Sequence, residues 1–320
     1  MNRNRCVKQD VRRQRQMDNK IEVIGVDHGW MNMKTVSEIF TSGVKETTEP
    51  AICENTLEYR GKFYKVGGDR LEVNENKVAD DNYYLLTLAA IAKELKNRKK
   101  QKADIILAVG IPLTKFAKEK RDFISYLSKN KQILFRYEKV LYNINLVKVV
   151  VFPQCYAAVA DSLPESSKKH LVVDVGSWTI DIMPIVNCMP DESICDTQDE
   201  GLIRCINRIN DKCVRSLNGK LDESEIIEVM RTGKNDDLPS EYLELVLSEI
   251  EAFAEGIYQR LISAGYNINT TPITFVGGGA TVMRLFGKRK QNNIKYLEDI
   301  HANAKGFEFL ANVMLMNQRG

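Results

Sequence analysis

The chain has 320 residues, of which 43% are apolar and 28% are charged, the balance of an ordinary globular protein. This composition excludes a largely disordered chain, a collagen-like fibre and a small disulfide-rich domain. A single core seldom grows beyond about 250–300 residues, so we expect two domains. The formal charge of +3 is uneven: residues 1–16 carry six basic groups and one acidic group, whereas the remainder carries 40 basic and 42 acidic groups. The pattern predicts a basic disordered tail over residues 1–19.

Neither a membrane span nor a thiol-based metal site is expected. No apolar run approaches the ~18 residues that a transmembrane helix needs, and the basic N-terminus lacks the apolar stretch of a secretion signal. The seven cysteines contain no C-x-x-C pair and there are only three histidines, which disfavours a zinc or redox site. We therefore expect a cytoplasmic protein with reduced thiols and no membrane partner.

Strands and helices alternate in the first half of the chain. A strand is expected from Ile21, another over 33–40, and a hairpin around a turn at Gly61-Lys62. Residues 81–100 are expected to form an amphipathic helix, because apolar side chains recur there every three or four positions. The next elements are a buried strand, a helix, a pair of strands and a short helix, expected over residues 103–112, 113–130, 132–153 and 155–163.

The second half starts in the same way and then becomes mainly helical. A polar break over residues 164–169 precedes two strands within 170–186. A late strand over 272–278 leads into a glycine-rich turn, and a last helix is expected near 303–316. The other helices follow from 3.6-residue periodicity over residues 200–217, 224–233 and 241–265. Strands mixed with helices in both halves predict an α/β fold.

One short pattern occurs twice, once in each half. The first copy is Asp27-x-Gly29-x-x-Asn32-x-Lys34, and the second, 147 residues later at every position, begins at Asp174. In the second copy, Asp174 is followed by Gly176, Thr179 and Asp181 at the same spacing. Each copy follows an apolar strand, so the aspartate lies at a strand end and the glycine permits a close backbone approach. The turn's N–H groups and the Asn or Thr side chain can donate to phosphate oxygens, which predicts a phosphate clamp between two similar domains.

A third element fits the same ligand. An apolar strand ends in Gly277-Gly278-Gly279-Ala280 and leads into a helix, where the backbone can lie flat against a polar ligand. The alternative is simply a tight strand-to-helix turn. The chain has no G-x-x-x-x-G-K-[S/T] sequence, which excludes a P-loop, and no strand–G-x-G-x-x-G–helix unit, which disfavours a Rossmann dinucleotide site.

These elements resemble the two phosphate motifs and the adenosine motif of the actin/Hsp70/sugar-kinase ATPase superfamily. Over roughly residues 20–315 the chain is similar, more narrowly, to the bacterial actin-like plasmid-segregation proteins of the ParM/StbA family. The segments that carry this resemblance are, in order, IGVDHGWMNMK, LTLAAIAKEL, ILAVGIPL, VFPQCYAA, EVMRTG and FVGGGA.

The resemblance implies an actin-like fold, with two similar ribonuclease-H-like domains around a nucleotide cleft. Domain I would span residues 20–166 and domain II residues 167–302. The C-terminal helix, about 303–320, would pack back on domain I.

The resemblance also implies roles for individual residues. Asp27 and Asp174 would hold Mg²⁺, mostly through water, since this ion prefers oxygen ligands and retains waters. Lys34 would reach the β- and γ-phosphates as a point charge. Gln154 would position the attacking water, and Asp174 would polarise it, because a carboxylate can accept its proton. The alternatives are purely structural: the two aspartates would cap strand ends, Lys34 would be a solvated lysine, and Gln154 would be the first residue of a helix.

The remaining candidate residues would bind the phosphates and the nucleoside of ATP or GTP. Asp181 is expected to orient its loop. Arg231 would lie against the base, although a surface arginine explains it equally well. Trp178 departs from the Gly-rich form usual in the second loop, which leaves the hydrolysis rate open. The nucleotide-binding candidates are Asp27, Gly29, Asn32, Lys34, Gly176, Ser177, Thr179, Arg231, Gly277, Gly278, Gly279 and Ala280.

The function implied is a nucleoside triphosphatase whose activity is coupled to head-to-tail filament assembly and to segregation of plasmid or mobile-element DNA. Heterologous contacts that do not close generate such filaments. The expected partners are further copies of the chain and a DNA-binding adaptor of the ParR type on a centromere-like site. No helix-turn-helix or zinc finger is present, so direct sequence reading of DNA is not expected. The alternatives are a small-molecule kinase of the same superfamily and a non-hydrolysing nucleotide-binding adaptor.

Overall fold

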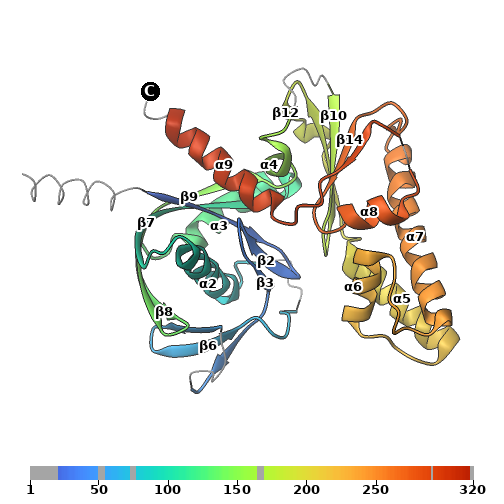
Figure 1. Cartoon of the computed structure of the whole chain (residues 1–320). Helices are drawn as coiled ribbons and strands as arrows, with labels where there is room; N and C mark the ends of the chain where they lie inside the picture. Colours follow the sequence, from blue (N-terminus) through green and yellow to red (C-terminus); the bar gives the residue numbers. More distant parts are fainter. Residues whose placement is uncertain (1–20, 50–54, 73–76, 164–168, 290, 318–320) are drawn as a thin grey trace, which may run out of the picture. The chain divides into compact units, whose positions relative to one another are not determined.

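The computed structural model describes residues 21–49, 55–72, 77–163, 169–289 and 291–317, which form two compact units (Figure 1). Unit 1 contains the described residues up to Ile111, Lys115–Phe152 and the described residues from Ala304 onward. Unit 2 contains Pro112–Thr114 and the described part of Pro153–Asn303. The basic tail expected over 1–19 lies outside the described residues, and the expected domain bounds stay a prediction. Cysteines at 155, 195, 205 and 213 form no disulfide.

Within the described residues, unit 1 is built on a nine-stranded sheet of order β3-β2-β1-β7-β9-β8-β5-β6-β4 (Figure 1). Strand β7 is almost continuously apolar and buried, as expected for the middle of a covered sheet, whereas β9 alternates buried and more exposed residues before three buried valines at 149–151. The strands of this sheet are β1 (Glu22–His28), β2 (Asn32–Thr35), β3 (Ile39–Thr41), β4 (Val44–Thr47), β5 (Thr56–Tyr59), β6 (Lys62–Val66), β7 (Lys102–Ile111), β8 (Gln132–Tyr137) and β9 (Val140–Pro153).

The expected single strand over 33–40 is wrong, because the chain turns between β2 and β3. The backbone N–H of Thr35 donates to the carbonyl of Glu38 at 2.8 Å, which closes the turn. The carboxylate of Glu94 accepts hydrogen bonds from the Ser37 backbone and hydroxyl at 3.0 and 2.7 Å. A side chain from a distant helix therefore fixes a turn that local sequence does not signal.

Helix α2 (Asn82–Asn97) lies in the core of unit 1. Most of its side chains are buried, including the predicted apolar face. Its neighbours in the core come from the sheet and from α3 (Leu113–Leu127), which contributes Phe123 and Leu127. The helix at 81–100 and the helix beginning at 113 are confirmed. Burial of this cluster joins β1 and β2, which carry the first motif, to the core of unit 1.

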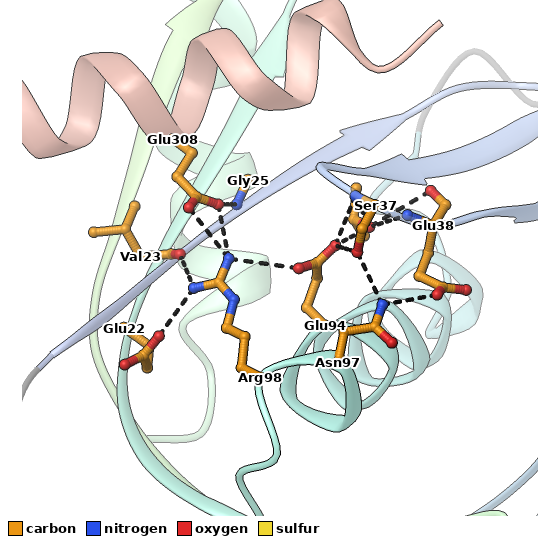
Figure 2. A network of polar contacts seen from close by, with 10 residues as sticks. Glu22, Val23, Gly25, Ser37, Glu38, Glu94, Asn97, Arg98 and Glu308 are labelled. Atoms are coloured by element: carbon orange, nitrogen blue, oxygen red, sulfur yellow. Dashed lines mark hydrogen bonds and ion pairs between the residues drawn. The ribbon is translucent and has the colours of Figure 1, made fainter. Parts of the chain in front are cut away.

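Arg98, at the end of α2, joins three segments of unit 1 (Figure 2). Its guanidinium donates to Glu22 at 3.0 Å, to the Val23 carbonyl at 2.7 Å and to Glu308 at 2.9 Å. Glu308 belongs to α9 (Ala302–Asn317) and also accepts from the backbone N–H of Gly25 at 3.3 Å. The C-terminal helix is thereby fastened to β1, the strand that carries the first aspartate.

Unit 2 is built on a smaller sheet of order β12-β11-β10-β14-β15, with β13 paired to β11. Helices from the second half of the chain accompany it (Figure 1). Its strands are β10 (Lys169–Val175), β11 (Ile180–Val186), β12 (Met189–Pro190), β13 (Asp196–Gln198), β14 (Ile273–Val276) and β15 (Ile294–Tyr296). Its helices are α4 (Tyr156–Val159), η1 (Glu192–Ile194), α5 (Leu202–Leu217), α6 (Glu223–Thr232), α7 (Ser240–Ser263) and α8 (Ala280–Phe286), with the first two residues of α9.

Both units contain the same three-strand arrangement. Strand β1 pairs antiparallel with β2 and parallel with β7, and β10 pairs antiparallel with β11 and parallel with β14. In the first pair Asp27 is opposite Lys34, and in the second Asp174 is opposite Asp181. The repeat found in the sequence is therefore a structural repeat as well. Because the register is the same, both aspartates reach corresponding places at the end of their strand.

Candidate functional site

In unit 1, the first motif forms a charged pair at the end of β1. Asp27 is 4% exposed, and the ammonium of Lys34 lies 3.5 Å from its Oδ2. The pair results from the antiparallel register, which places the two side chains opposite each other on adjacent strands. A buried carboxylate needs a polar partner, and this lysine supplies one. A cation and an anion are thus held together where the sequence predicts the phosphates.

The loop after Asp27 is tight for a local reason. A Cβ on Gly29 would lie 2.4 Å from the carbonyl oxygen of Asn32, so no larger residue fits there. Ser42 holds the loop from outside: its hydroxyl donates to the Gly29 carbonyl at 2.7 Å and its N–H donates to Met31 at 3.0 Å. Gly29, Asn32, Lys34 and Asp27 are thus brought together within unit 1.

Two other residues of this loop serve to fix it to α2. His28 is fully buried and bonds to the Thr87 hydroxyl at 2.8 Å, and burial together with the charge of Lys77 lowers the pKa of His28 to about 3. The ammonium of Lys77 donates to the His28 carbonyl and lies 4.7 Å from the centroid of the Trp30 ring. Trp30 packs edge-on against Tyr83 at 6.1 Å. A neutral histidine and a cation–π contact therefore stabilise the loop rather than perform chemistry.

In unit 2, the second motif centres on Asp174. This carboxylate is 7% exposed, and its Oδ2 accepts a 2.9 Å hydrogen bond from the side-chain amide of Asn303. On the other side, a Cβ on Gly277 would lie 2.1 Å from Oδ1. Beneath it, burial and the charges of Asp174 and Asp181 raise the pKa of the Cys155 thiol well above its usual value. That cysteine is an unreactive neighbour of the carboxylate.

The loop between β10 and β11 is held through its carbonyl groups. The start of α5 donates to them: Leu202 N–H to Gly176 at 3.1 Å, Ile203 N–H to Ser177 at 2.9 Å and Gly201 N–H to Trp178 at 2.8 Å. A Cβ on Gly201 would lie 2.5 Å from the carbonyl carbon of Trp178, so this position requires glycine. With its carbonyls fixed toward α5, the loop has a defined backbone direction, which a phosphate-binding turn requires.

Three side chains keep the end of this loop in place. Within the loop, the hydroxyl of Thr179 donates to Asp181 at 3.0 Å. Thr197 donates to the other oxygen of Asp181 at 2.5 Å. Trp178 turns toward α5, with the Arg204 guanidinium 6.0 Å from its ring. The hydroxyl of Thr179 thus joins the end of the loop to Asp181 on β11, and the orienting role of Asp181 stays a prediction.

The three glycines after β14 have different reasons to be glycine. Gly277 has φ of +80° and faces Asp174, and a Cβ on Gly279 would lie 2.3 Å from a methyl carbon of Val175. Gly278 has open space around it within 4 Å. The fold thus requires two of the glycines, whereas Gly278 leaves open room beside the backbone. Ala280 follows as the first residue of α8.

Two further predicted residues, Gln154 and Arg231, lie outside the two loops. Gln154 lies half-buried where β9 gives way to α4, with its carbonyl accepting from Tyr156 at 2.7 Å. Arg231 is exposed in the last turn of α6, a helix that contacts α8. Sequence reasoning missed Asn303, Lys77 and Gly201. Only the contact between Asn303 and Asp174, 129 residues apart, reveals the first of these.

Among the described residues, no group of three or more His, Cys, Asp or Glu side chains could hold a metal ion. Each unit has a buried aspartate at the end of a strand, Asp27 in unit 1 and Asp174 in unit 2, and unit 2 also buries Asp181 beside its loop. Oxygen ligands of this kind suit Mg²⁺, which usually keeps several waters and binds through one or two carboxylates plus phosphates. The chemistry of the donor set thus fits a magnesium ion that arrives with a nucleotide. None of the described helices is both long and apolar enough to cross a membrane.

Comparison with known proteins gives the class of this fold. Residues 25–156 match the family model described as "Actin like proteins N terminal domain". An archaeal actin homologue, Ta0583 in complex with ADP, is 20% identical with a TM-score of 0.72, covering 92% of this chain and 100% of its own. The apo pSK41 ParM protein is 18% identical with a TM-score of 0.70, covering 94% and 99%. No curated protein sequence matches the chain.

A third structure extends the comparison to an assembled state. A 15-stranded ParM filament from Clostridium botulinum is 18% identical with a TM-score of 0.70, covering 92% of this chain and 99% of its own. The protein therefore has the actin-like α/β fold, and the resemblance to bacterial actin-like proteins is confirmed.

Proposed function

We propose that this protein is an actin-like filament-forming nucleoside triphosphatase that binds ATP or GTP with Mg²⁺ and drives segregation of plasmid or mobile-element DNA. The observation that carries the proposal is the structural repeat. In both units an aspartate ends a strand that pairs antiparallel with the next strand and parallel with a later one. Each aspartate is followed two residues later by a glycine whose tight turn closes on the next strand.

The two loops would act on the phosphates of the same nucleotide. Lys34 supplies a positive charge close to Asp27, and loop 176–179 supplies backbone N–H groups and the Ser177 hydroxyl. Because Thr179 already donates to Asp181, its part is to orient this loop. Asp27 and Asp174 would hold Mg²⁺, mostly through water, and the ion when bound neutralises phosphate charge. Arg231 and the loop Gly277–Ala280 would line the nucleoside.

Hydrolysis would depend on two residues of unit 2. Gln154 would hold the attacking water by hydrogen bonding from the junction of β9 and α4. Asp174 would accept the proton of that water, since its carboxylate is fixed and buried at the end of β10. The lysine and the loop N–H groups stabilise the charge that develops on the transferred phosphoryl group.

Filament assembly is supported by two of the structural neighbours, and the role in DNA segregation is part of the proposal. One of them is a ParM filament, and another is titled "Alp12 filament structure". Head-to-tail contacts between copies would generate a filament, since they are heterologous and do not close. The partner at a filament end would be a DNA-binding adaptor of the ParR type on a centromere-like site. Nucleotide state would control the filament through different contacts in its two states.

The experiment is sedimentation with parallel phosphate release for the parent chain and for Asp174→Ala. We expect the variant to pellet with nucleotide and Mg²⁺ but to release phosphate at least about 100-fold more slowly, so that its filaments persist. Asp211→Ala, an exposed position on α5, serves as the matched control. Phosphate release by Asp174→Ala at the parent rate would exclude the catalytic role of Asp174.

The same assay separates the other candidate functions. Turnover stimulated by a sugar or another small acceptor, with no pellet, would identify a small-molecule kinase. Nucleotide binding with neither a pellet nor phosphate release would identify a non-hydrolysing adaptor.

A further inference from the structure

Asn303 lies beside the proposed catalytic carboxylate without belonging to either repeat. It is the second residue of α9 and the last residue of unit 2, and it is 7% exposed. Its side-chain Nδ2 donates to Oδ2 of Asp174 at 2.9 Å. A carboxylate oxygen only accepts hydrogen bonds, so the NH₂ group of the amide must face it. The orientation of the Asn303 amide is therefore fixed by its partner.

The other end of this amide is buried and, among the described residues, has no partner. Oδ1 of Asn303 makes no hydrogen bond within the described chain. A buried carbonyl oxygen without a donor is costly, and native proteins commonly satisfy such groups with an ordered water. Because Nδ2 and Oδ1 belong to one planar amide, a water that donates to Oδ1 would be held by the same group that holds the Asp174 carboxylate.

Asn303 is not needed to cap its own helix. The carboxylate of Asp299 accepts from the backbone N–H of His301 at 2.9 Å, and the carbonyl of Asp299 accepts from Ala302 at 3.0 Å. These two bonds satisfy the N–H groups of His301 and Ala302 at the start of α9 without the Asn303 side chain. The buried amide at position 303 therefore has a purpose beyond the helix end.

The carboxylate is also fixed from its second oxygen. Gly277 leaves no room for even a methyl group beside Oδ1, since a Cβ there would lie 2.1 Å away. Gly279 donates its N–H to the carbonyl of Val175 at 2.9 Å, which anchors the glycine loop to the strand that carries Asp174. One oxygen of the carboxylate is thus bonded to Asn303, and the other is packed against Gly277.

We propose that Asn303 is a positioning residue for hydrolysis: its NH₂ group fixes the rotamer of Asp174, and its Oδ1 accepts a hydrogen bond from a water beside that carboxylate. This role rests on the proposed function, because it concerns the reaction that Asp174 performs. Holding a reactive carboxylate and a water in one geometry affects the rate of the chemical step more than the affinity for the nucleotide.

Three substitutions at position 303 separate this role from a purely structural one. Asn303→Leu has similar size but removes both the donor and the acceptor. Asn303→Asp has the same shape and keeps an acceptor but loses the amide donor toward Asp174. Asn303→Gln keeps both amide groups on a longer side chain. Asn312→Leu is the matched control, because Asn312 is exposed on the same helix and donates to the Glu308 carbonyl at 2.9 Å.

Each variant is measured in three ways: thermal unfolding, affinity for a fluorescent ADP analogue in EDTA, and phosphate release at saturating nucleotide and Mg²⁺. We expect Asn303→Leu and Asn303→Asp to lower kcat by about 10- to 100-fold, the size of effect that misplacing a catalytic group produces. Nucleotide affinity without metal should stay within about threefold of the parent, because in the proposed role the amide acts on Asp174 and a water rather than on the nucleotide. Asn303→Gln should recover part of the lost kcat.

Parent-level kcat in Asn303→Leu or in Asn303→Asp would overturn the proposal. Equal losses of kcat and of metal-free ADP affinity, with no recovery in Asn303→Gln, would also overturn it and would indicate a structural role. If Asn303→Leu unfolds, the two variants that keep polar side chains decide the matter. A parent protein that binds nucleotide but releases no phosphate would refute the proposed function itself, together with this role. A hydrolysing parent with unaffected variants would refute only the role of Asn303.

Discussion

The ammonium of Lys34 lies 3.5 Å from the carboxylate of Asp27. The two residues face each other because β1 and β2 pair in a register that places position 27 opposite position 34. At the corresponding place in unit 2, Asp174 faces Asp181. The two halves of the repeat therefore differ in charge: the first holds a cation against its aspartate, and the second surrounds its aspartates with amide and hydroxyl donors.

This difference predicts that Lys34 contributes directly to nucleotide affinity. In Lys34→Met the affinity for a nucleoside triphosphate should fall by about 10- to 100-fold, the value of a charge-assisted hydrogen bond to phosphate. Isothermal titration of the parent and the variant measures it. The control is Lys45→Met, because Lys45 is an exposed residue of β4, and this variant should bind nucleotide as the parent does. Equal affinities for parent and Lys34→Met would remove this lysine from the site.

The glycines after β14 should respond differently to the same substitution. Gly277→Ala should destabilise unit 2 and disturb Asp174, because φ is +80° and the new methyl group would meet the carboxylate at 2.1 Å. Gly278→Ala meets open space, so it should unfold within a few degrees of the parent but bind nucleotide more weakly. Thermal unfolding and nucleotide titration compare the two. A Gly278→Ala protein with parent affinity would show that no ligand approaches this backbone.

The network around Arg98 predicts opposite pH effects at two glutamates. Burial favours the neutral form of Glu94, but hydrogen bonds from Thr35 and Ser37 outweigh it and lower the pKa of Glu94 below its usual value. At Glu308, burial prevails over the attraction of Arg98 and raises the pKa. Both carboxylates contact the same guanidinium (Figure 2).

The signs follow from proton linkage. The stability contributed by Glu94 is present above its unfolded pKa and is lost as the pH falls through its lower folded pKa. The contribution of Glu308 is present below its unfolded pKa and is lost as the pH rises through its higher folded pKa. Urea unfolding at pH 4 and pH 7 should therefore show that Glu94→Gln costs more at pH 7 and Glu308→Gln costs more at pH 4. The same pH trend in both variants would contradict this assignment.

The sequence predicts those parts of the site that depend on local pattern. The positions of Asp27 and Asp174 at strand ends follow from apolar runs that stop at an acidic residue and a glycine. The strand after residue 272 and its glycine turn follow from an apolar run that ends in three glycines. The turn between β2 and β3 could not be predicted, because Glu94 from a distant helix makes it. Asn303 was missed for the same reason, since nothing near position 303 signals a contact with Asp174.

The roles of some polar side chains likewise depend on partners that sequence does not show. The hydroxyl of Thr179, which is predicted to donate to phosphate, donates in this structure to Asp181 at 3.0 Å. Trp30 and Trp178 occupy matching positions in the two loops, yet one packs against Lys77 and Tyr83 and the other against Arg204. The non-repeated parts of each unit therefore surround equivalent positions of the repeat with different side chains.

The central claim is that nucleotide binding and hydrolysis control assembly of this chain. Its most direct test is sedimentation with simultaneous phosphate release, after addition of ATP or of GTP with Mg²⁺, and with EDTA as the control. The account predicts a pellet that appears with nucleotide and Mg²⁺, shrinks as phosphate is released, and contains filaments under the electron microscope. A protein that stays in the supernatant under all these conditions, or that pellets equally with EDTA, would contradict it.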